Sequence, residues 1–145
     1  MTPGDEIRNL LGQYCERIDT ADFDGVGELF EHAALADEHG RELARGSAAV
    51  RDFYRAGTLL HDGSPRTKHV VTNTVLDVSE GTDRAGARSS YVVLQQVGDG
   101  PLHPIITGRY HDSFERHDGR WRFAERRFLV DLVGDLRDHL AYELG

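Results

Sequence analysis

The sequence predicts one α+β domain over residues 1–145, in which helices pack on a curved, mainly antiparallel sheet around a pocket that mixes apolar and titratable side chains. Apolar residues in the first part of the chain recur at the spacing of a helix face, whereas those in the second part alternate as in half-buried strands. Short turn sequences join the strand-like segments, and such turns connect antiparallel neighbours because a parallel return needs a long crossover. Helices followed by a run of strands are typical of the α+β class.

The first part of the chain predicts three helices and a short pair of strands. One apolar stripe at helical spacing defines the first helix: Ile7, Leu10, Leu11, Tyr14, Cys15 and Ile18. Asp22 is placed to cap a short second helix and Ser47 to cap a third. We expect the two short strands within 33–45. A last helix is expected over 134–144, where three leucines would share one face.

The second part of the chain predicts four long strands. They cover 67–79, 87–97, 103–116 and 120–132. The last two are separated by His117-Asp118-Gly119, a strong hairpin signal. We therefore expect the four strands to form an antiparallel meander.

Composition narrows the classes of partner. The chain has 145 residues with 39% hydrophobic and 29% charged residues, as expected of a folded domain. Its net charge of −8 argues against nucleic acid, because binding phosphates needs clustered Lys and Arg. No apolar run approaches the ~18 residues of a membrane span and no basic-plus-apolar leader is seen, so we expect neither a membrane span nor a signal peptide. Cys15 is the single cysteine, which fits a reducing compartment, so we expect a cytoplasmic protein.

The expected strand over 103–116 carries a carboxylate among core residues. Alternation puts these residues on one face: Ile106, Gly108, Tyr110, Asp112 and Phe114. A buried carboxylate is costly unless it is paired or protonated, so Asp112 should have a partner or a raised pKa. The alternative is an Asp near the strand end that meets water or an arginine such as Arg127.

Three further polar residues lie where a pocket is expected. His69 shares a strand face with Asn73, and its imidazole suits a general acid or base, although a satisfied core or rim histidine is the alternative. Tyr14 is central in the stripe of the first helix and offers a phenol to whatever it faces. Asp19 lies beside that stripe at the end of the helix. Periodicity alone would place Asp19 on the surface unless a partner such as His69 lies opposite.

Other chemistries lack their motifs. Eight histidines are present, but none form HxH or HxxxH pairs on one element, so no metal site is expected. The chain has no GxSxG, P-loop or GxGxxG sequence, and no cofactor is expected.

Several stretches, taken in order, resemble one known superfamily. They are YCERIDTADFD (14–24), LF (29–30), GSAAVRDFY (46–54), KHVVTN (68–73), GRYHDSF (108–114) and DGRWRFAERR (118–127). In order and spacing they are similar to the SnoaL-like branch of the nuclear transport factor 2-like superfamily. The resemblance implies a cone-shaped α+β half-barrel with a ligand pocket between helices and sheet, and commonly a homodimer through the sheet.

The resemblance implies an acid–base site of the dehydratase kind. In scytalone dehydratase and bile-acid 7α-dehydratase an Asp on the first helix pairs with a His on the third strand, and Asp19 and His69 match those positions. Tyr14 matches the tyrosine of the bile-acid enzyme, and Asp112 would tune the pocket. The second histidine of scytalone dehydratase is replaced here by residues near Gln95. This pattern implies cofactor-free elimination on a hydrophobic polyketide- or steroid-like molecule.

Two other interpretations stay open. A match to ketosteroid isomerase places Glu38 as the base, with Asp37 competing, and Tyr14 and Asp112 as donors; polyketide cyclases use related carboxylates. A non-catalytic binding or dimerisation module would keep the fold but separate Asp19 from His69. A relative of dioxygenase small subunits is a further alternative. The resemblance also implies a substrate pocket lined by Glu38, Tyr54, Asn73, Tyr91, Tyr110, Trp121 and Arg127.

Overall fold

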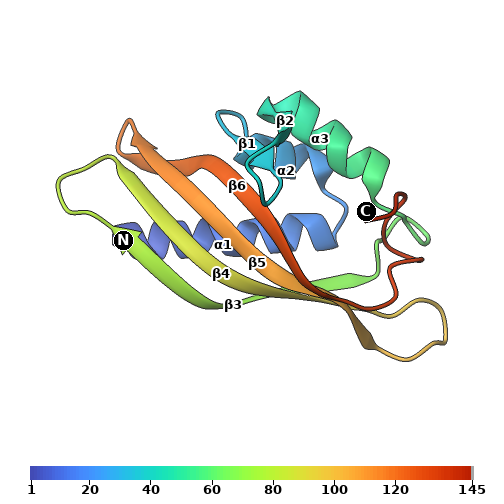
Figure 1. Cartoon of the computed structure of the whole chain (residues 1–145). Helices are drawn as coiled ribbons and strands as arrows, with labels where there is room; N and C mark the ends of the chain where they lie inside the picture. The colour runs from blue at the N-terminus through green and yellow to red at the C-terminus, as the bar shows by residue number, and fades with distance from the viewer. Residues whose placement is uncertain (145) are drawn as a thin grey trace.

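The first helix begins where the sequence caps it. α1 (Pro3–Asp19) has Thr2 as its N-cap, whose side chain accepts from the backbone of Asp5 while the Asp5 carboxylate accepts in return. The computed structural model describes residues 1–144, and in it this helix lies across the concave face of the sheet (Figure 1). Four residues of the predicted stripe, Ile7, Leu11, Tyr14 and Ile18, are buried, and the other two are half-buried. Its last turn therefore lies beside the start of the third strand, where the candidate site forms.

The second and third helices pack together at one end of the sheet (Figure 1). α2 (Phe23–Leu29) is capped by Asp22 as predicted, with the carboxylate accepting from the Gly25 amide. α3 (Gly46–Gly57) begins one residue before the predicted cap, so that interpretation of Ser47 is wrong. Gly46, at a φ of +84°, makes the turn from strand to helix, and Ser47 already lies within the helix.

The six strands form one curled, unclosed sheet in the order β2-β1-β6-β5-β4-β3. Their bounds are β1 Ala34–Ala36, β2 Glu42–Arg45, β3 Thr67–Val78, β4 Arg84–Gln95, β5 His103–His117 and β6 Arg120–Val133. The predicted antiparallel meander is confirmed for β3 to β6. Only β1 runs parallel to its neighbour β6 among the described strands. The predicted α+β class with helices on a curved sheet is thus confirmed.

Two irregularities change which side chains face the core. Asn73 has a φ of 54° at a shift in register between β3 and β4, so its side chain is exposed and the following residues exchange faces. A shift between β5 and β6 lies beside Phe114, where Phe123 pairs with Phe114 but Glu125 pairs with Ser113. That extra residue turns Arg126 inward and leaves Arg127 exposed.

The segment after β6 is not the expected helix. Residues 134–144 cross the end of the sheet and run back beside the exit of α3 (Figure 1). The Leu59 amide donates to the carbonyl of His139 at 2.9 Å, and the Ala141 amide donates to the carbonyl of Gly57 at 3.0 Å. Within 134–144 only one helix-like turn forms, with the amides of His139 and Leu140 donating to the Leu136 carbonyl, and the bonds to Leu59 and Gly57 hold the segment over the pocket. Within residues 1–144, no helix has the length and apolar character to cross a membrane.

Candidate active site

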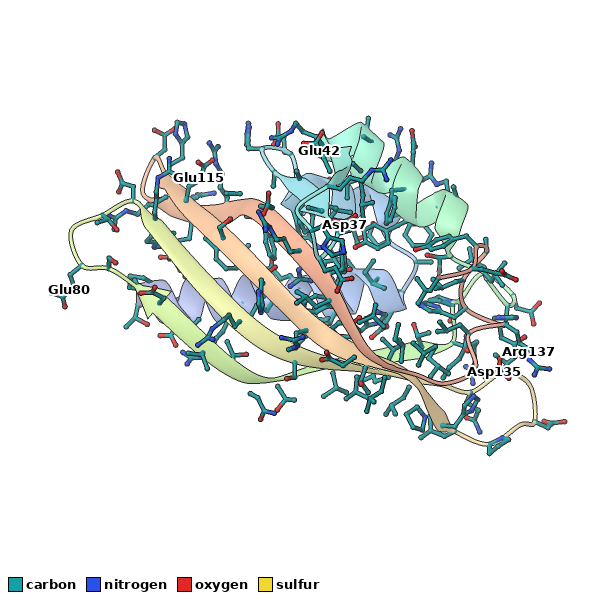
Figure 2. The ribbon with its side chains drawn as sticks, viewed as in Figure 1. Asp37, Glu42, Glu80, Glu115, Asp135 and Arg137 are labelled. Atoms are coloured by element: carbon teal, nitrogen blue, oxygen red, sulfur yellow. The ribbon has the colours of Figure 1, made fainter. Side chains whose placement is uncertain are left out.

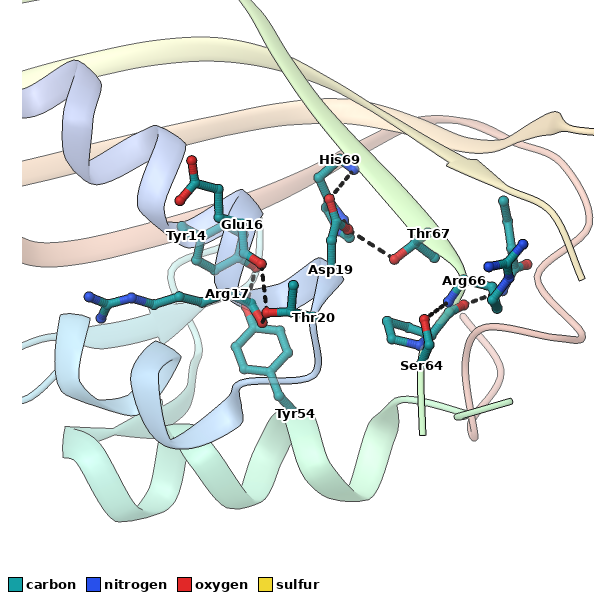
Figure 3. Close-up of polar contacts among 12 residues, drawn as sticks. Tyr14, Glu16, Arg17, Asp19, Thr20, Tyr54, Ser64, Arg66, Thr67 and His69 are labelled. Carbon is teal, nitrogen blue, oxygen red and sulfur yellow. Dashed lines mark hydrogen bonds and ion pairs between the residues drawn. The ribbon is translucent and has the colours of Figure 1, made fainter. Parts of the chain in front are cut away.

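Asp19 and His69 form a direct contact at the end of α1. Asp19 Oδ1 lies 2.6 Å from His69 Nδ1, and its Oδ2 accepts from the His69 backbone amide at 2.8 Å. The Thr67 hydroxyl, two residues earlier on β3, donates to Oδ1 at 2.9 Å (Figure 3). The expected pair is therefore brought together, and a third residue, which the sequence did not single out, holds the carboxylate.

This geometry sets the orientation of the imidazole. An ionised carboxylate only accepts hydrogen bonds, so with Asp19 ionised the His69 Nδ1 carries the proton and donates it. The other ring nitrogen, Nε2, is left for a ligand. The His69 side chain is 7% exposed and the Asp19 side chain 15%, so water screens the contact little. An orienting carboxylate behind an imidazole is the arrangement of many general acid–base sites.

His69 opens into a cavity of about 560 Å³ between the helices, the sheet and residues 139–144. The volume suits a small organic molecule. Its aromatic lining comprises Tyr14, Phe53, Tyr54, Tyr91, Tyr110, Phe128 and Tyr142. Four predicted pocket residues, Glu38, Tyr54, Tyr91 and Tyr110, are among the lining residues. The pocket is therefore largely aromatic with a few polar groups.

The Tyr14 hydroxyl is 2.5 Å from the Tyr54 hydroxyl (Figure 3). Burial raises the pKa of Tyr14 to about 12 and that of Tyr54 well above its ordinary value. Both phenols are therefore neutral at physiological pH. They can donate hydrogen bonds to an oxygen but cannot act as bases.

Asp112 lies behind the pocket wall rather than in it. Its partner is Arg126, not the expected Arg127: Nε donates to Oδ1 at 2.8 Å and Nη2 to Oδ2 at 3.0 Å, and both side chains are fully buried. Burial raises the pKa of Asp112, while the charge and hydrogen bonds of Arg126 oppose that rise. The guanidinium lies over the rings of Tyr14 and Tyr110, 4.2 and 3.7 Å from their centroids, and these two rings meet at 73°. Asp112 therefore positions the aromatic wall through Arg126.

Three predicted pocket residues lie outside the cavity. Asn73 is exposed at the β3 irregularity, and Arg127 is exposed and paired with Glu125 at 2.7 Å. Trp121 is buried at the opposite end of the sheet, where its backbone amide donates to Glu6 on the first turn of α1. Trp121 lines a second, open hollow of about 590 Å³ there, which is rimmed by charged side chains and lies away from the acid–base pair.

The carboxylates at the pocket mouth differ in how they are engaged. Asp37, beside β6 in Figure 2, accepts from the backbone amides of Arg41 and His39 at 2.9 Å each, and these bonds lower its pKa. Glu38 lines the mouth with a half-exposed side chain 3.4 Å from His39. Neither lies on the wall that carries His69. A base in the ketosteroid isomerase position would thus act from the mouth.

Sequence reasoning missed two buried groups. Arg126 was hidden by the irregularity in β6, since simple alternation points it outward. His139 lines the pocket at 8% exposure, but it lies in the segment that was expected to be a helix. Among residues 1–144, no group of three or more His, Cys, Asp or Glu is placed to hold a metal ion.

Sequence comparison assigns the family. A family model described as a SnoaL-like domain matches residues 3–127, so the chain belongs to the SnoaL-like family, as the resemblance predicted. No protein of curated function matches the chain.

Solved structures share the fold. A variant of Rv3472, a protein of unknown function from Mycobacterium tuberculosis, is 29% identical over 92% of this chain and 78% of its own, with a TM-score of 0.71. A protein described as a scytalone dehydratase from Novosphingobium aromaticivorans is 19% identical over 97% of this chain and 88% of its own, with a TM-score of 0.72. ActVI-ORFA from Streptomyces coelicolor is 20% identical over 90% of this chain and 98% of its own, also with a TM-score of 0.72.

Proposed function

We propose that this chain is a cofactor-free acid–base enzyme that eliminates water from a hydrophobic, oxygenated small molecule. The observation that carries the proposal is the 2.6 Å contact between Asp19 and His69 at the wall of a cavity of about 560 Å³. The scytalone dehydratase description of one structural neighbour agrees with this class of reaction.

In the proposed reaction one imidazole handles both protons. His69 Nε2 removes a proton from a carbon next to a carbonyl, and the C–H electron pair forms the new double bond. The resulting imidazolium, stabilised by Asp19, returns the proton to the β-hydroxyl, which leaves as water. The Tyr14 and Tyr54 hydroxyls bond to each other, so one phenol would donate its proton to the other, and the second would donate to the carbonyl oxygen as negative charge develops on it. The enzyme ends in its starting protonation state.

Specific observations weigh against the alternatives. The ketosteroid isomerase arrangement needs a neutral Asp112 that donates to substrate, whereas this carboxylate accepts two bonds from Arg126 behind the wall. The binding-module alternative expects Asp19 and His69 to be separated, which the contact disfavours.

The test is turnover of β-hydroxytetralone, a bicyclic β-hydroxy ketone whose loss of water yields fluorescent α-naphthol. We expect the wild-type chain to catalyse this reaction and Asp19→Asn and His69→Gln to lower kcat/KM by about 10²–10⁴-fold. Asp83→Asn removes an exposed carboxylate that pairs with Arg116 at 2.9 Å, and it should keep the full rate. Equal rates in Asp19→Asn, His69→Gln and the wild type would refute the proposal.

We further propose that two chains pair through the outer face of the sheet, as the resemblance implied. Val75 on β3 and Leu132 on β6 are exposed apolar residues, at 52% and 70% exposure. Light scattering should show a dimer for the wild type and a monomer for Leu132→Glu. A monomeric wild type would contradict the proposed dimer.

A further inference from the structure

We propose that His139 is a second imidazole that contacts the substrate, and that with His69 it selects an uncharged, hydroxyl-bearing aromatic molecule. The proposal deepens the proposed function and rests on it for the position of the reacting group. His139 comes from the segment after β6, and it lines the same cavity as His69.

The main chain around His139 is held from two sides. The carbonyl of Asp138 accepts from Gln95 Nε2 on β4 at 3.0 Å and lies 2.7 Å from His61 Nε2. The Leu59 amide donates to the carbonyl of His139 itself at 2.9 Å. These contacts therefore fix the place from which the His139 side chain projects.

The His139 ring lies close to the His69 ring. Its ring centroid lies 6.3 Å from that of His69, with 63° between the ring planes. No hydrogen bond joins the two rings among the described contacts, so His69 does not take up a ring nitrogen of His139. Because both rings line the same cavity, one ligand in it can contact both imidazoles.

His139 is buried without using its hydrogen-bonding capacity. The residue is 8% exposed, and within residues 1–144 its Nδ1 is a buried atom with no hydrogen-bond partner. A buried polar atom that bonds to nothing costs about 1–3 kcal/mol, so such atoms call for a reason. Anchoring is not the reason, because Gln95, His61 and the backbone do that work. Because Nδ1 has almost no accessible surface, a ligand in the cavity would meet the other ring nitrogen, Nε2, which makes no hydrogen bond among the described contacts.

The charges around the pair define the class of ligand. Burial and the nearby His69 lower the pKa of His139 to about 4, so at neutral pH its ring is uncharged, with one donor and one acceptor. Such a ring suits a hydroxyl or carbonyl better than an anion. Asp37, Glu38 and Glu143 line the mouth of the cavity and repel anionic ligands. The aromatic walls favour a flat ring system.

The test measures binding of three probes that share one skeleton: β-naphthol, β-naphthoate and naphthalene. For the wild-type chain we expect β-naphthol to bind about tenfold more tightly than β-naphthoate. Nitrogen NMR of histidine-labelled protein should show that β-naphthol shifts the ring nitrogens of both His69 and His139. His139→Phe keeps the ring shape and should weaken β-naphthol about 3- to 10-fold while leaving naphthalene unchanged. His117→Phe, at the far hairpin, is the matched control and should bind as the wild type does.

The outcomes separate this inference from the proposed function. If His139→Phe binds β-naphthol as tightly as the wild type, or the His139 signals do not move, the inference is overturned even when Asp19→Asn and His69→Gln still abolish turnover. Tighter binding of β-naphthoate overturns the stated ligand class. If His139→Phe does not fold, the NMR shifts of the wild type decide the question.

Discussion

Replacing Asp112 by asparagine should leave a buried positive charge without its counter-ion behind the pocket wall. Both side chains of the Asp112–Arg126 pair are fully buried, and two charge-assisted hydrogen bonds of 2.8 and 3.0 Å join them. Such bonds contribute about 1.5–3 kcal/mol each, and the asparagine oxygen can still accept one of them. Breaking one partner of a buried ion pair costs about 3–5 kcal/mol. We expect Asp112→Asn to lower the free energy of unfolding by that amount.

Urea unfolding at neutral pH, followed by circular dichroism, measures this loss. The matched control is Glu115→Gln, which breaks the Glu115–Arg122 pair between the same two strands. That pair has a similar separation of 2.9 Å, but its side chains are 31% and 30% exposed, so we expect a loss below about 1 kcal/mol. The double replacement of Asp112 by Leu and Arg126 by Met should recover stability to within about 1 kcal/mol of the wild type.

A loss of stability in Asp112→Asn no greater than that in Glu115→Gln would refute the expected cost of the unpaired charge. In that case water would reach the Arg126 guanidinium, although the guanidinium is fully buried against the rings of Tyr14 and Tyr110. A double variant as unstable as Asp112→Asn would show instead that packing, and not the unpaired charge, accounts for the loss.

Two further predictions concern the pocket wall and its histidine. The folded-state pKa of His139 lies below its unfolded value of 6.5, at about 4, so its contribution to stability is present above pH 6.5 and is lost as pH falls toward 4. Relative to His139→Phe, the unfolding free energy of the wild type should drop by about 2–3 kcal/mol over that range; parallel pH profiles would contradict this. Gly108→Ala places a methyl group against the Leu129 carbonyl and the Tyr91 hydroxyl, and should cost about 3 kcal/mol in urea unfolding. Gly12→Ala on α1 meets no atom and should cost nothing, so equal losses would rule out the clash.

Much of the fold follows from local pattern, because the pattern repeats over many residues. The stripe on α1 and the alternation on β5 are long enough that one misplaced residue does not change the interpretation. The Asp22 cap is equally local, since the side chain bonds to an amide only three residues away. Each of these features depends on neighbours in sequence, which is the information that a single chain contains.

The errors arise where distant residues decide. An extra residue in a strand moves every following side chain to the other face, so Asn73 was placed inward and Arg126 outward. The left-handed backbone of Asn73 is a conformation that Asn tolerates, but alternation alone does not reveal it. The leucine spacing of 134–144 predicts a helix, but backbone hydrogen bonds to the residues at the end of α3 hold this segment in another conformation. The sequence of the segment itself does not indicate these bonds.

The candidate site also depends on contacts between residues that are distant in the sequence. Asp19 and His69 are fifty positions apart, and each taken alone has a structural interpretation on the surface or the rim. In the sequence, only the resemblance to a family pattern predicts that these two residues form a pair. His139 had no such pattern to reveal it, because its place depends on how Gln95 and the α3 exit hold the chain.

The polar groups in and behind the pocket divide the chemical roles among themselves. Burial keeps the phenols of Tyr14 and Tyr54 protonated, so they can donate but not abstract. Asp112 is buried in an ion pair with Arg126 behind the pocket wall. Burial and the nearby His69 lower the pKa of His139, so its ring is uncharged at neutral pH. His69 is the imidazole with a carboxylate behind it, and imidazole gains and loses protons near neutral pH. On the proposed function, His69 is therefore the group that would move the proton between carbon and oxygen, and the neighbouring groups would select and orient the substrate.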